Sequence, residues 1–277
     1  MKVFQSFAKI LIIVLMSIVL ARSSKKVFNF SQNKINIENT VFIEDDLKSY
    51  DHILKQKFYY LSQGSQFYVF ISEDKNYVIK FLKSYRQDRF FYKFLKLFSN
   101  KHQRKDFYQK LKFHNLKKNI FQVYENLKDQ TALIYVHLNN TKSNKFLNVY
   151  YKLHRKHNIN LDRSYFVIQK KVQCIYDIFH NKYISNDYKK NLILLYFNLI
   201  KDIDKTGFAY DDYHLKNIGI HENKLIIFDI GSFHFKDNKK ISEYDMFKKN
   251  TYRLFDEIKN NIKLNTYYID RFDEYKK

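Results

Sequence analysis

The stretch Gly207–Phe233 reads GFAYDDYHLKNIGIHENKLIIFDIGSF, and it contains three of the four glycines of the chain, Gly207, Gly219 and Gly231. In a sequence this poor in glycine, each one is expected where the backbone needs a residue without a side chain. The mostly apolar run Lys224–Phe228 predicts a short strand that ends directly before an acid. Backbone turns, a strand and acidic side chains are thus concentrated in one stretch.

The polar residues of this stretch have the spacing of a cation site. Asn217 stands five positions after Asp212, and Asp229 stands twelve positions after Asn217. Residues 218–228 predict a hairpin around a polar turn, and a hairpin of this length brings Asn217 and Asp229 to one end. Two oxygen ligands suit Mg²⁺, which completes its coordination shell with water and phosphate oxygens. Asp212, one loop away, is then placed to orient and deprotonate a hydroxyl nucleophile.

The composition predicts a folded and strongly basic protein. A length of 277 residues with 45% hydrophobic residues suits one large domain or two small lobes, and it argues against a wholly disordered chain. The net charge of +22 fits an anionic membrane surface as a partner, although an excess of Lys, Asn, Ile, Phe and Tyr is also typical of an AT-rich genome. Because the basic residues are spread along the chain, a nucleic-acid partner is not expected. The one cysteine, Cys174, excludes an internal disulfide and a cysteine-based metal cluster.

An apolar segment lies near the N-terminus. A basic start precedes the run Ile10–Leu20, and Ala21 supplies a small residue at a cleavage point. This pattern predicts a cleavable signal peptide, and an uncleaved anchor or an ordinary buried helix are the alternatives. We therefore expect the protein to be exported or anchored to a membrane through this segment. Positive charge directly after the segment hinders export, and it is supplied by Arg22, Lys25 and Lys26.

The rest of the chain predicts an α+β order. Strands are expected at Phe58–Leu61, Phe67–Phe70, Tyr77–Phe81, Phe146–Tyr151, Tyr165–Gln169 and Lys224–Phe228. Helical structure is expected over residues 84–138, over Leu192–Ile203 before Gly207, and in the tail 236–277, with a turn at 158–164. Strands therefore dominate the N-terminal part and helices dominate the C-terminal part.

Four short motifs together resemble the protein-kinase-like fold over about residues 61–233. They are the catalytic-loop pattern Asp212-Tyr-His-Leu-Lys-Asn217, the Asp229-Ile-Gly231 after a strand, the strand Tyr-Val-Ile-Lys80, and the turn Leu-Ser-Gln-Gly64-Ser-Gln before a strand. The resemblance implies a two-lobed protein-kinase-like fold with an N-terminal β-rich lobe and a mostly helical C-terminal lobe. It divides the chain into a signal peptide or anchor (1–22), a linker (23–45) and a kinase-like domain (46–277), with lobes at about 46–170 and 171–277.

The resemblance also implies ATP and Mg²⁺ as cofactors and assigns a role to each motif. Lys80 and the turn at Gly64 hold the nucleotide phosphates, Asn217 and Asp229 hold Mg²⁺, and Asp212 is the base. The segment Gln169-Lys170-Lys171 becomes the hinge that meets adenine, with Gln169 and Lys171 as contacts. The helix acid that pairs with Lys80 is assigned to Glu125, with Asp106 and Asp88 as alternatives.

The sequence differs from the protein-kinase pattern at positions that indicate which kind of phosphate acceptor to expect. Asp211 replaces the Arg before the catalytic Asp, and His214 stands at the position two after it, as in small-molecule kinases of the aminoglycoside and choline types and in lipopolysaccharide kinases. The short tail after Gly231 leaves no room for the usual peptide-substrate platform. These features favour a phosphotransferase acting on a hydroxyl of a sugar, a lipid-sugar or a small molecule. The alternatives are a pseudokinase and an exported basic binding protein without catalysis.

Overall fold

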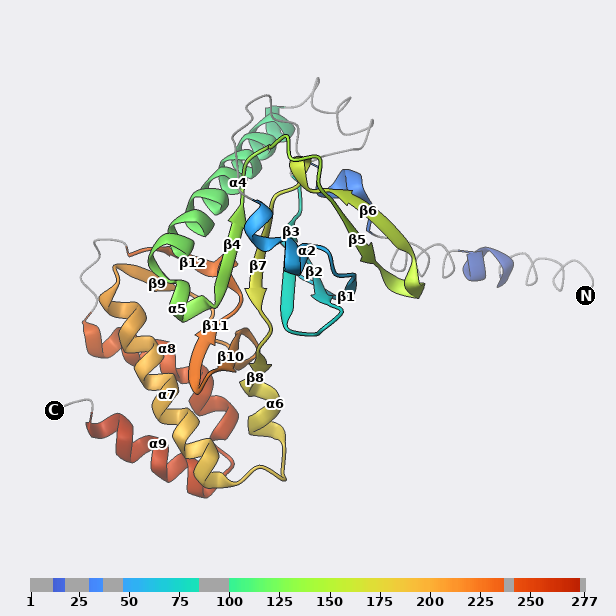
Figure 1. Ribbon diagram of the computed structural model, residues 1–277. Helices are drawn as coiled ribbons and strands as arrows, with labels where there is room; N and C mark the ends of the chain where they lie inside the picture. The colour runs from blue at the N-terminus through green and yellow to red at the C-terminus, as the bar shows by residue number, and fades with distance from the viewer. Residues whose placement is uncertain (1–11, 18–29, 37–46, 85–99, 237–241, 275–277) are drawn as a thin grey trace, which may run out of the picture. The chain divides into compact units, whose positions relative to one another are not determined.

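The computed structural model describes residues 12–17, 30–36, 47–84, 100–236 and 242–274 (Figure 1). The chain divides into two compact units. Unit 1 comprises Met1–Asp74, Lys80–Arg86 and Asn139–Tyr165, and unit 2 comprises Lys75–Ile79, Gln87–Leu138 and Phe166–Lys277. Strands dominate the N-terminal part and helices the C-terminal part, so the predicted α+β class is confirmed.

Unit 1 is built on a twisted set of neighbouring strands. β1 (Phe58–Gln63) and β2 (Phe67–Ser72) form the predicted antiparallel hairpin, and β3 (Tyr77–Leu82) passes from unit 2 into unit 1 at Lys80. β5 (Phe146–Tyr150) pairs with β1 in parallel, and β6 (Lys156–Asn160) pairs with β5 antiparallel. In hydrogen-bonding order the largest sheet runs β4-β7-β3-β2-β1-β5-β6.

Aromatic side chains fill one face of the unit 1 strands. The ring of Phe70 contacts those of Tyr60 and Phe81, and Phe30 packs against Phe70 with a centroid distance of 5.3 Å. Successive side chains of a strand point to opposite faces, so Lys80, next to Phe81, points to the other face of β3. The Lys80 side chain is therefore separated from the aromatic core of unit 1 although the residue is only 7% exposed.

Short helical turns complete unit 1. η1 (Gln32–Lys34), η2 (Leu47–Tyr50) and α2 (Asp51–Leu54) precede β1. η3 (Lys152–His154) forms the turn between β5 and β6, and η4 (Leu161–Arg163) follows β6. The prediction of a turn over residues 158–164 is wrong in its first part, because 156–160 is a strand whose register is set by pairing with β5.

Unit 2 holds the remaining strands. β4 (Leu133–His137) pairs with β7 (Phe166–Lys170). β8 (Gln173–Cys174), β10 (Ile218–His221) and β11 (Lys224–Ile227) form a second sheet, and β9 (Phe208–Tyr210) pairs with β12 (Phe233–Phe235). The helical prediction for 84–138 is wrong at its end, because residues 133–137 alternate between buried and half-buried positions as a strand does.

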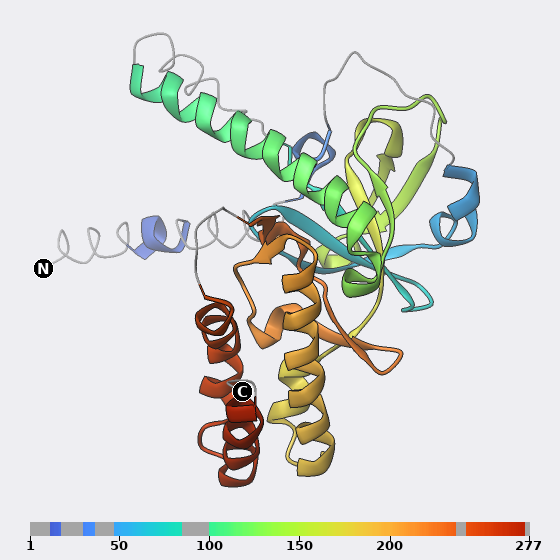
Figure 2. The same cartoon turned by 90° about the vertical axis from the view of Figure 1, so that its left-hand side faces the viewer.

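The helices of unit 2 pack around α7 (Asn186–Lys205), which contacts both α8 (Glu243–Ile258) and α9 (Ile262–Glu274) (Figure 2). Ser185 caps the first turn of α7 by accepting from Tyr188 N, and Gly207, at φ 77°, follows its end. α4 (Asn100–Asn126), α5 (Lys128–Thr131) and α6 (Ile175–His180) complete the unit. The predicted helix before Gly207 and the helical tail are confirmed, and the predicted helical residues 85–99 lie outside the described residues.

Candidate active site

The hairpin β10–β11 brings the predicted metal ligands to one end. Ile218 pairs with Ile227, and the two central turn residues Glu222 and Asn223 have φ angles of 48° and 62°, as a tight hairpin turn requires. The backbone N–H of Phe228 donates to the carbonyl of Asn217 at 2.9 Å. Asp229 therefore follows the residue opposite Asn217, at the same end of the two strands.

The amide of Asn217 is oriented by the catalytic loop itself. Its Nδ2 donates to the backbone carbonyl of Asp212 at 3.1 Å, so the amide oxygen is the group left to meet a cation. Asp229 accepts a hydrogen bond from Gly231 N at 3.3 Å through Oδ1, at the N-terminal cap of η6 (Ile230–Ser232). The site thus offers one amide oxygen and one carboxylate, which is the hard-oxygen donor set that Mg²⁺ accepts together with water and phosphate oxygens.

Tyr210 is a member of the site that sequence reasoning missed. Its pairing with Phe233 fixes it at the end of β9, two positions before Asp212. Burial raises the pKa of the Tyr210 hydroxyl well above its usual value, and the negative charges of Asp229 and Asp212 raise it further, with a smaller opposite effect of the Asn217 amide. Among the described residues, no group meets the buried hydroxyl oxygen at hydrogen-bonding geometry. The sequence signal was the short aromatic strand directly before the two acids.

The loop that carries Asp212 is held rigidly. The buried Tyr196 of α7 donates through its hydroxyl to the carbonyl of Tyr213 at 2.8 Å, and the carbonyl of Asp212 accepts from His214 N at 2.6 Å. The Asp212 carboxylate is half-buried, and no ion pair to it occurs within the described part of the chain. It is therefore held in position and open to a hydroxyl proton.

The His214 side chain caps a short helical turn of the loop that connects Asp212 to Asn217. Its Nδ1 accepts from Lys216 N at 3.4 Å and caps η5 (Leu215–Asn217), the turn that leads to Asn217. Asp211 is exposed and pairs with His234 at 3.4 Å, on the strand β12. The two adjacent acids of the motif thus differ, because exposed Asp211 contacts His234 and half-buried Asp212 acts with Asp229 on the Tyr210 hydroxyl.

The predicted phosphate-binding residues Gly64 and Lys80 lie in unit 1. Gly64 sits in the β1–β2 turn, where its N–H donates to Phe67 O at 3.0 Å and its carbonyl accepts from Lys83 Nζ at 2.5 Å. A side-chain carbon at Gly64 would meet nothing within 4 Å. The position is therefore an open turn, and its assignment and that of Lys80 to the nucleotide stay predictions.

The predicted hinge consists of the last two residues of β7 and the residue after it, in unit 2. Gln169 is buried, and its Nε2 donates to Thr131 O at 2.9 Å. The backbone N–H groups of Lys170 and Lys171 donate to the carbonyls of Ala132 and Asn76. Because the N–H groups of Lys170 and Lys171 already donate within the protein, this segment could meet adenine only through backbone carbonyl groups. The roles of Gln169 and Lys171 in nucleotide binding stay predictions.

The helix α4 lies against β4, β12 and η6, beside the Asp229 segment. Asn119 Nδ2 donates to Phe233 O at 3.0 Å. Glu125 is exposed, with no ion pair among the described residues, whereas Gln122 carries a buried Oε1 without a hydrogen-bond partner there. Glu125 as the partner of Lys80 stays a prediction, and the alternatives Asp88 and the side chain of Asp106 lie outside the described residues.

Gly219 lies where the backbone leaves no room for a side chain. A Cβ there would stand 2.4 Å from Val172 Cγ2 and 3.0 Å from Gln173 O, so the glycine lets β10 approach the residues at β8 closely.

Among the described residues, no group of three or more His, Cys, Asp and Glu side chains is placed to hold a metal ion. The candidate metal ligands are therefore the Asn217 amide oxygen and the Asp229 carboxylate.

No protein-family profile and no curated protein matches the sequence. Among solved structures, a crystal structure of WbdD overlaps with 70% of this chain and 37% of that chain, at 14% identity and a TM-score of 0.39. A structure of the bifunctional kinase-methyltransferase WbdD overlaps with 63% of this chain and 31% of that chain, at 15% identity and a TM-score of 0.35. The chain thus spans about a third of the length of these structures.

Proposed function

We propose that the protein is an ATP- and Mg²⁺-dependent phosphotransferase that acts on a hydroxyl acceptor. The observation that carries this proposal is the Asn217 side chain, whose Nδ2 is tied to the Asp212 carbonyl while Asp229 stands at the same end of the hairpin. This hydrogen bond braces the loop and leaves the amide oxygen of Asn217 available to a cation beside the proposed base. Tyr210 supports the proposal, because its buried hydroxyl lies among the same acids and lacks a partner among the described residues.

The chain's own residues supply the base and the orientation for the reaction. The acceptor oxygen attacks the γ-phosphorus, the bond from that phosphorus to the bridging oxygen breaks, ADP leaves, and the acceptor proton moves to the Asp212 carboxylate. Mg²⁺ held by Asn217 and Asp229 would neutralise phosphate charge. The acceptor is proposed as a sugar, a lipid-sugar or a small molecule, because His214 stands where small-molecule kinases carry a histidine.

A pseudokinase is the second candidate, and two observations favour it. Glu125 is exposed, and the N–H groups of Lys170 and Lys171 are committed within the protein. A chain of this kind would bind the nucleotide without transferring phosphate.

The test measures thermal unfolding of the full chain with ATP, with Mg²⁺ and with both. Nucleotide and metal together should raise the midpoint by several degrees, since a ligand at about 100 times its Kd stabilises by about 2.7 kcal/mol. The Asp229→Ala variant should lose the Mg²⁺-dependent part of the shift. The adjacent control Asp211→Ala removes an exposed acid that pairs with His234, and it should keep the full shift.

Hydrolysis of ATP, with water as acceptor, separates the enzyme from the pseudokinase. The Asp212→Ala variant should keep the thermal shift but lose at least about a hundredfold in hydrolysis. A shift without hydrolysis in the wild type would identify a pseudokinase. The absence of any shift, or a shift that survives in Asp229→Ala, would overturn the proposal and leave the basic binding protein.

A further inference from the structure

The segment between β4 and β7 belongs to unit 1, and it contains none of the residues that we assign to the phosphotransferase site. Residues 139–165 fold into β5 and β6, and β5 joins the edge of β1 in parallel with Phe58 opposite Val149. β6 then stands last in the sheet order. We call residues 142–163 the basic hairpin.

The charge of the basic hairpin is almost entirely positive. Its one acid, Asp162, is only 6% exposed and accepts from Ser143 N, Ser143 Oγ and Asn144 N at 2.6 to 2.9 Å. This carboxylate is therefore turned inward and offers little negative charge to a partner. Basic side chains lie along the length of the hairpin, and those that are exposed are Lys142, Arg155, Lys156 and Arg163.

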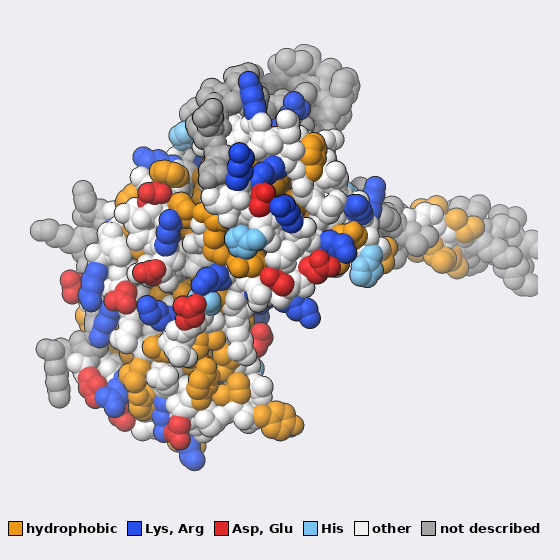
Figure 3. All heavy atoms as spheres, viewed as in Figure 1, with side chains coloured by type: hydrophobic (Ala, Val, Ile, Leu, Met, Phe, Trp, Pro, Cys, Tyr) orange, Lys and Arg blue, Asp and Glu red, His pale blue; other side chains and the backbone are white. Residues whose placement is uncertain are grey.

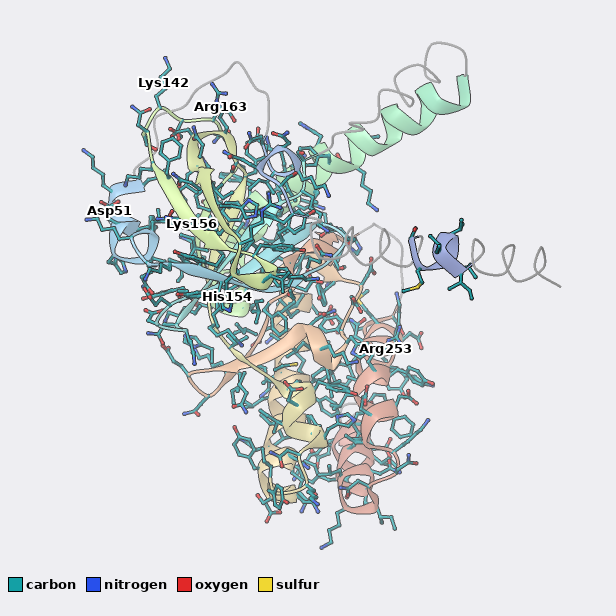
Figure 4. The ribbon with its side chains drawn as sticks, turned by 90° about the vertical axis from the view of Figure 1, so that its right-hand side faces the viewer. Asp51, Lys142, His154, Lys156, Arg163 and Arg253 are labelled. Atoms are coloured by element: carbon teal, nitrogen blue, oxygen red, sulfur yellow. The ribbon has the colours of Figure 1, made fainter. Side chains whose placement is uncertain are left out.

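The exposed cations are distributed over both ends of the hairpin. Lys142 and Arg163 lie at the end where the strands leave the unit, His154 lies at the turn, and Lys156 lies between them (Figure 4). In the space-filling view, Lys, Arg and His side chains lie over the part of the surface that carries β5 and β6 (Figure 3). An extended anionic surface can meet such a row at several points at once.

The turn of the hairpin presents an apolar side chain in a left-handed backbone. Leu153 is 77% exposed, and Leu153 and His154 have φ angles of 57° and 55°. Two consecutive left-handed residues are what a tight hairpin turn requires, as at Glu222 and Asn223, and the turn leaves the Leu153 side chain exposed at the tip. Exposed Leu153 between Lys152 and Arg155 is the pattern of a loop that inserts an apolar tip while cations contact headgroups.

The sequence between Phe30 and the apolar run Ile10–Leu20 limits the distance of that run from the basic hairpin. Phe30 stacks on Tyr151 at a centroid distance of 5.3 Å and meets His157 edge-on at 5.0 Å, so it lies against the hairpin. Residues 21–29 connect the apolar run to Phe30, and a fully extended chain of that length spans at most about 30 Å. An apolar segment held in a bilayer would therefore keep the hairpin near the headgroups.

We propose that the basic hairpin docks on an anionic lipid surface, with Lys142, Arg155, Lys156 and Arg163 at the headgroups and Leu153 at the interface. The positive row, the exposed apolar tip and the short connection to an apolar segment all favour a membrane over a nucleic acid. The proposal concerns a surface of unit 1 and does not depend on phosphate transfer.

The test measures sedimentation of the full chain with vesicles of phosphatidylcholine alone and with vesicles that also contain phosphatidylglycerol. The variant Lys142→Gln, Arg155→Gln, Lys156→Gln and Arg163→Gln should bind the anionic vesicles at least about tenfold more weakly, and binding to neutral vesicles should not change. Binding of the wild type to anionic vesicles should fall as salt rises, because exposed charges are screened.

A matched control removes the same charge from unit 2. Its four substitutions are Lys248→Gln, Lys249→Gln, Arg253→Gln and Lys263→Gln, all at exposed positions of α8 and α9. This variant should bind the anionic vesicles as the wild type does. A second variant, Leu153→Asn, places a residue that tolerates the left-handed backbone at the tip, so the hairpin should stay folded while vesicle binding weakens.

Three outcomes would overturn the proposal. Equal losses in the hairpin variant and in the control would show that net charge alone drives binding. Binding to anionic vesicles that does not respond to salt would remove the role of the cations. A hairpin variant that loses binding to single-stranded RNA but keeps its vesicle binding would assign the surface to nucleic acid. The ATP–Mg²⁺ thermal shift of the hairpin variant should equal that of the wild type, which separates this test from that of the phosphotransferase site.

Discussion

Close packing between β10 and the residues at β8 requires glycine at position 219. Replacement by Ala would place Cβ at 2.4 Å from Val172 Cγ2 and at 3.0 Å from the backbone oxygen of Gln173, neither of which can move freely. We expect Gly219→Ala to destabilise the protein by about 1–3 kcal/mol, as overpacking does, and urea unfolding measures the change.

Gly64→Ala is the matched control for this prediction. A Cβ at Gly64 would meet nothing within 4 Å, so its unfolding midpoint should stay close to that of the wild type. Equal stability of Gly219→Ala and the wild type would contradict the close approach of β10 and β8.

The residues of the site differ in how far the sequence could predict them. Asn217 and Asp229 could be placed at one end of a hairpin because their spacing and the strand between them depend on local pattern alone. Tyr210 could not, because its place depends on the pairing of β9 with β12, between strands separated by more than twenty residues in the chain. The reason for Gly219 likewise lies in Val172, on another element.

The loop before β5 is held by a single buried carboxylate, that of Asp162, which accepts hydrogen bonds from Ser143 and Asn144. Burial alone would raise the pKa of Asp162, but hydrogen bonds from Ser143, Thr141 and Asn144 lower it below its usual value. A carboxyl with a lowered folded pKa stabilises the protein above the unfolded value of about 3.9, and this contribution is lost as the pH falls through the folded pKa.

We expect Asp162→Asn to unfold more easily than the wild type at neutral pH, by at least about 2 kcal/mol, because hydrogen bonds to a charged acceptor are lost. The difference should shrink as the pH falls from about 5 towards and below the folded pKa of Asp162. Urea unfolding of both proteins across this range measures it. A difference that stays constant with pH would show that the negative charge of Asp162 does not matter.

Elements with a strong local pattern were predicted, and elements that depend on partners were not. The periodic helix α7 and the hairpin β1–β2 are at the predicted positions, since their apolar spacing and turn residues are local. The sequence predicts helix over β4 and a turn over the second half of β6, because both strands are short and gain their stability from a neighbouring strand, β7 and β5 respectively.

At the scale of the whole molecule, the proposed reaction and the N-terminal segment make opposing demands. Phosphate transfer requires ATP, whereas a cleavable signal would carry the chain to a compartment that holds little of it. None of the described helices is long and apolar enough to cross a bilayer, and of the N-terminal run only residues 12–17 are described, as helix. Basic residues lie on both sides of the run, with Lys2 and Lys9 before it and Arg22, Lys25 and Lys26 after it, so the two flanks oppose each other in setting the orientation of a retained segment.

The proposed phosphotransferase therefore favours the alternative of an uncleaved anchor, with the chain after it on the side that contains ATP. A reporter fused after Lys26 measures this: a fluorescent protein that folds only in the cytoplasm should be active, and alkaline phosphatase, which requires export, should be inactive. Substitution of Arg22, Lys25 and Lys26 by Gln should increase export of the fusion, because the positive flank that opposes translocation is removed. Active alkaline phosphatase in the unmodified fusion would place the domain outside, and the phosphotransferase would then need ATP in that compartment.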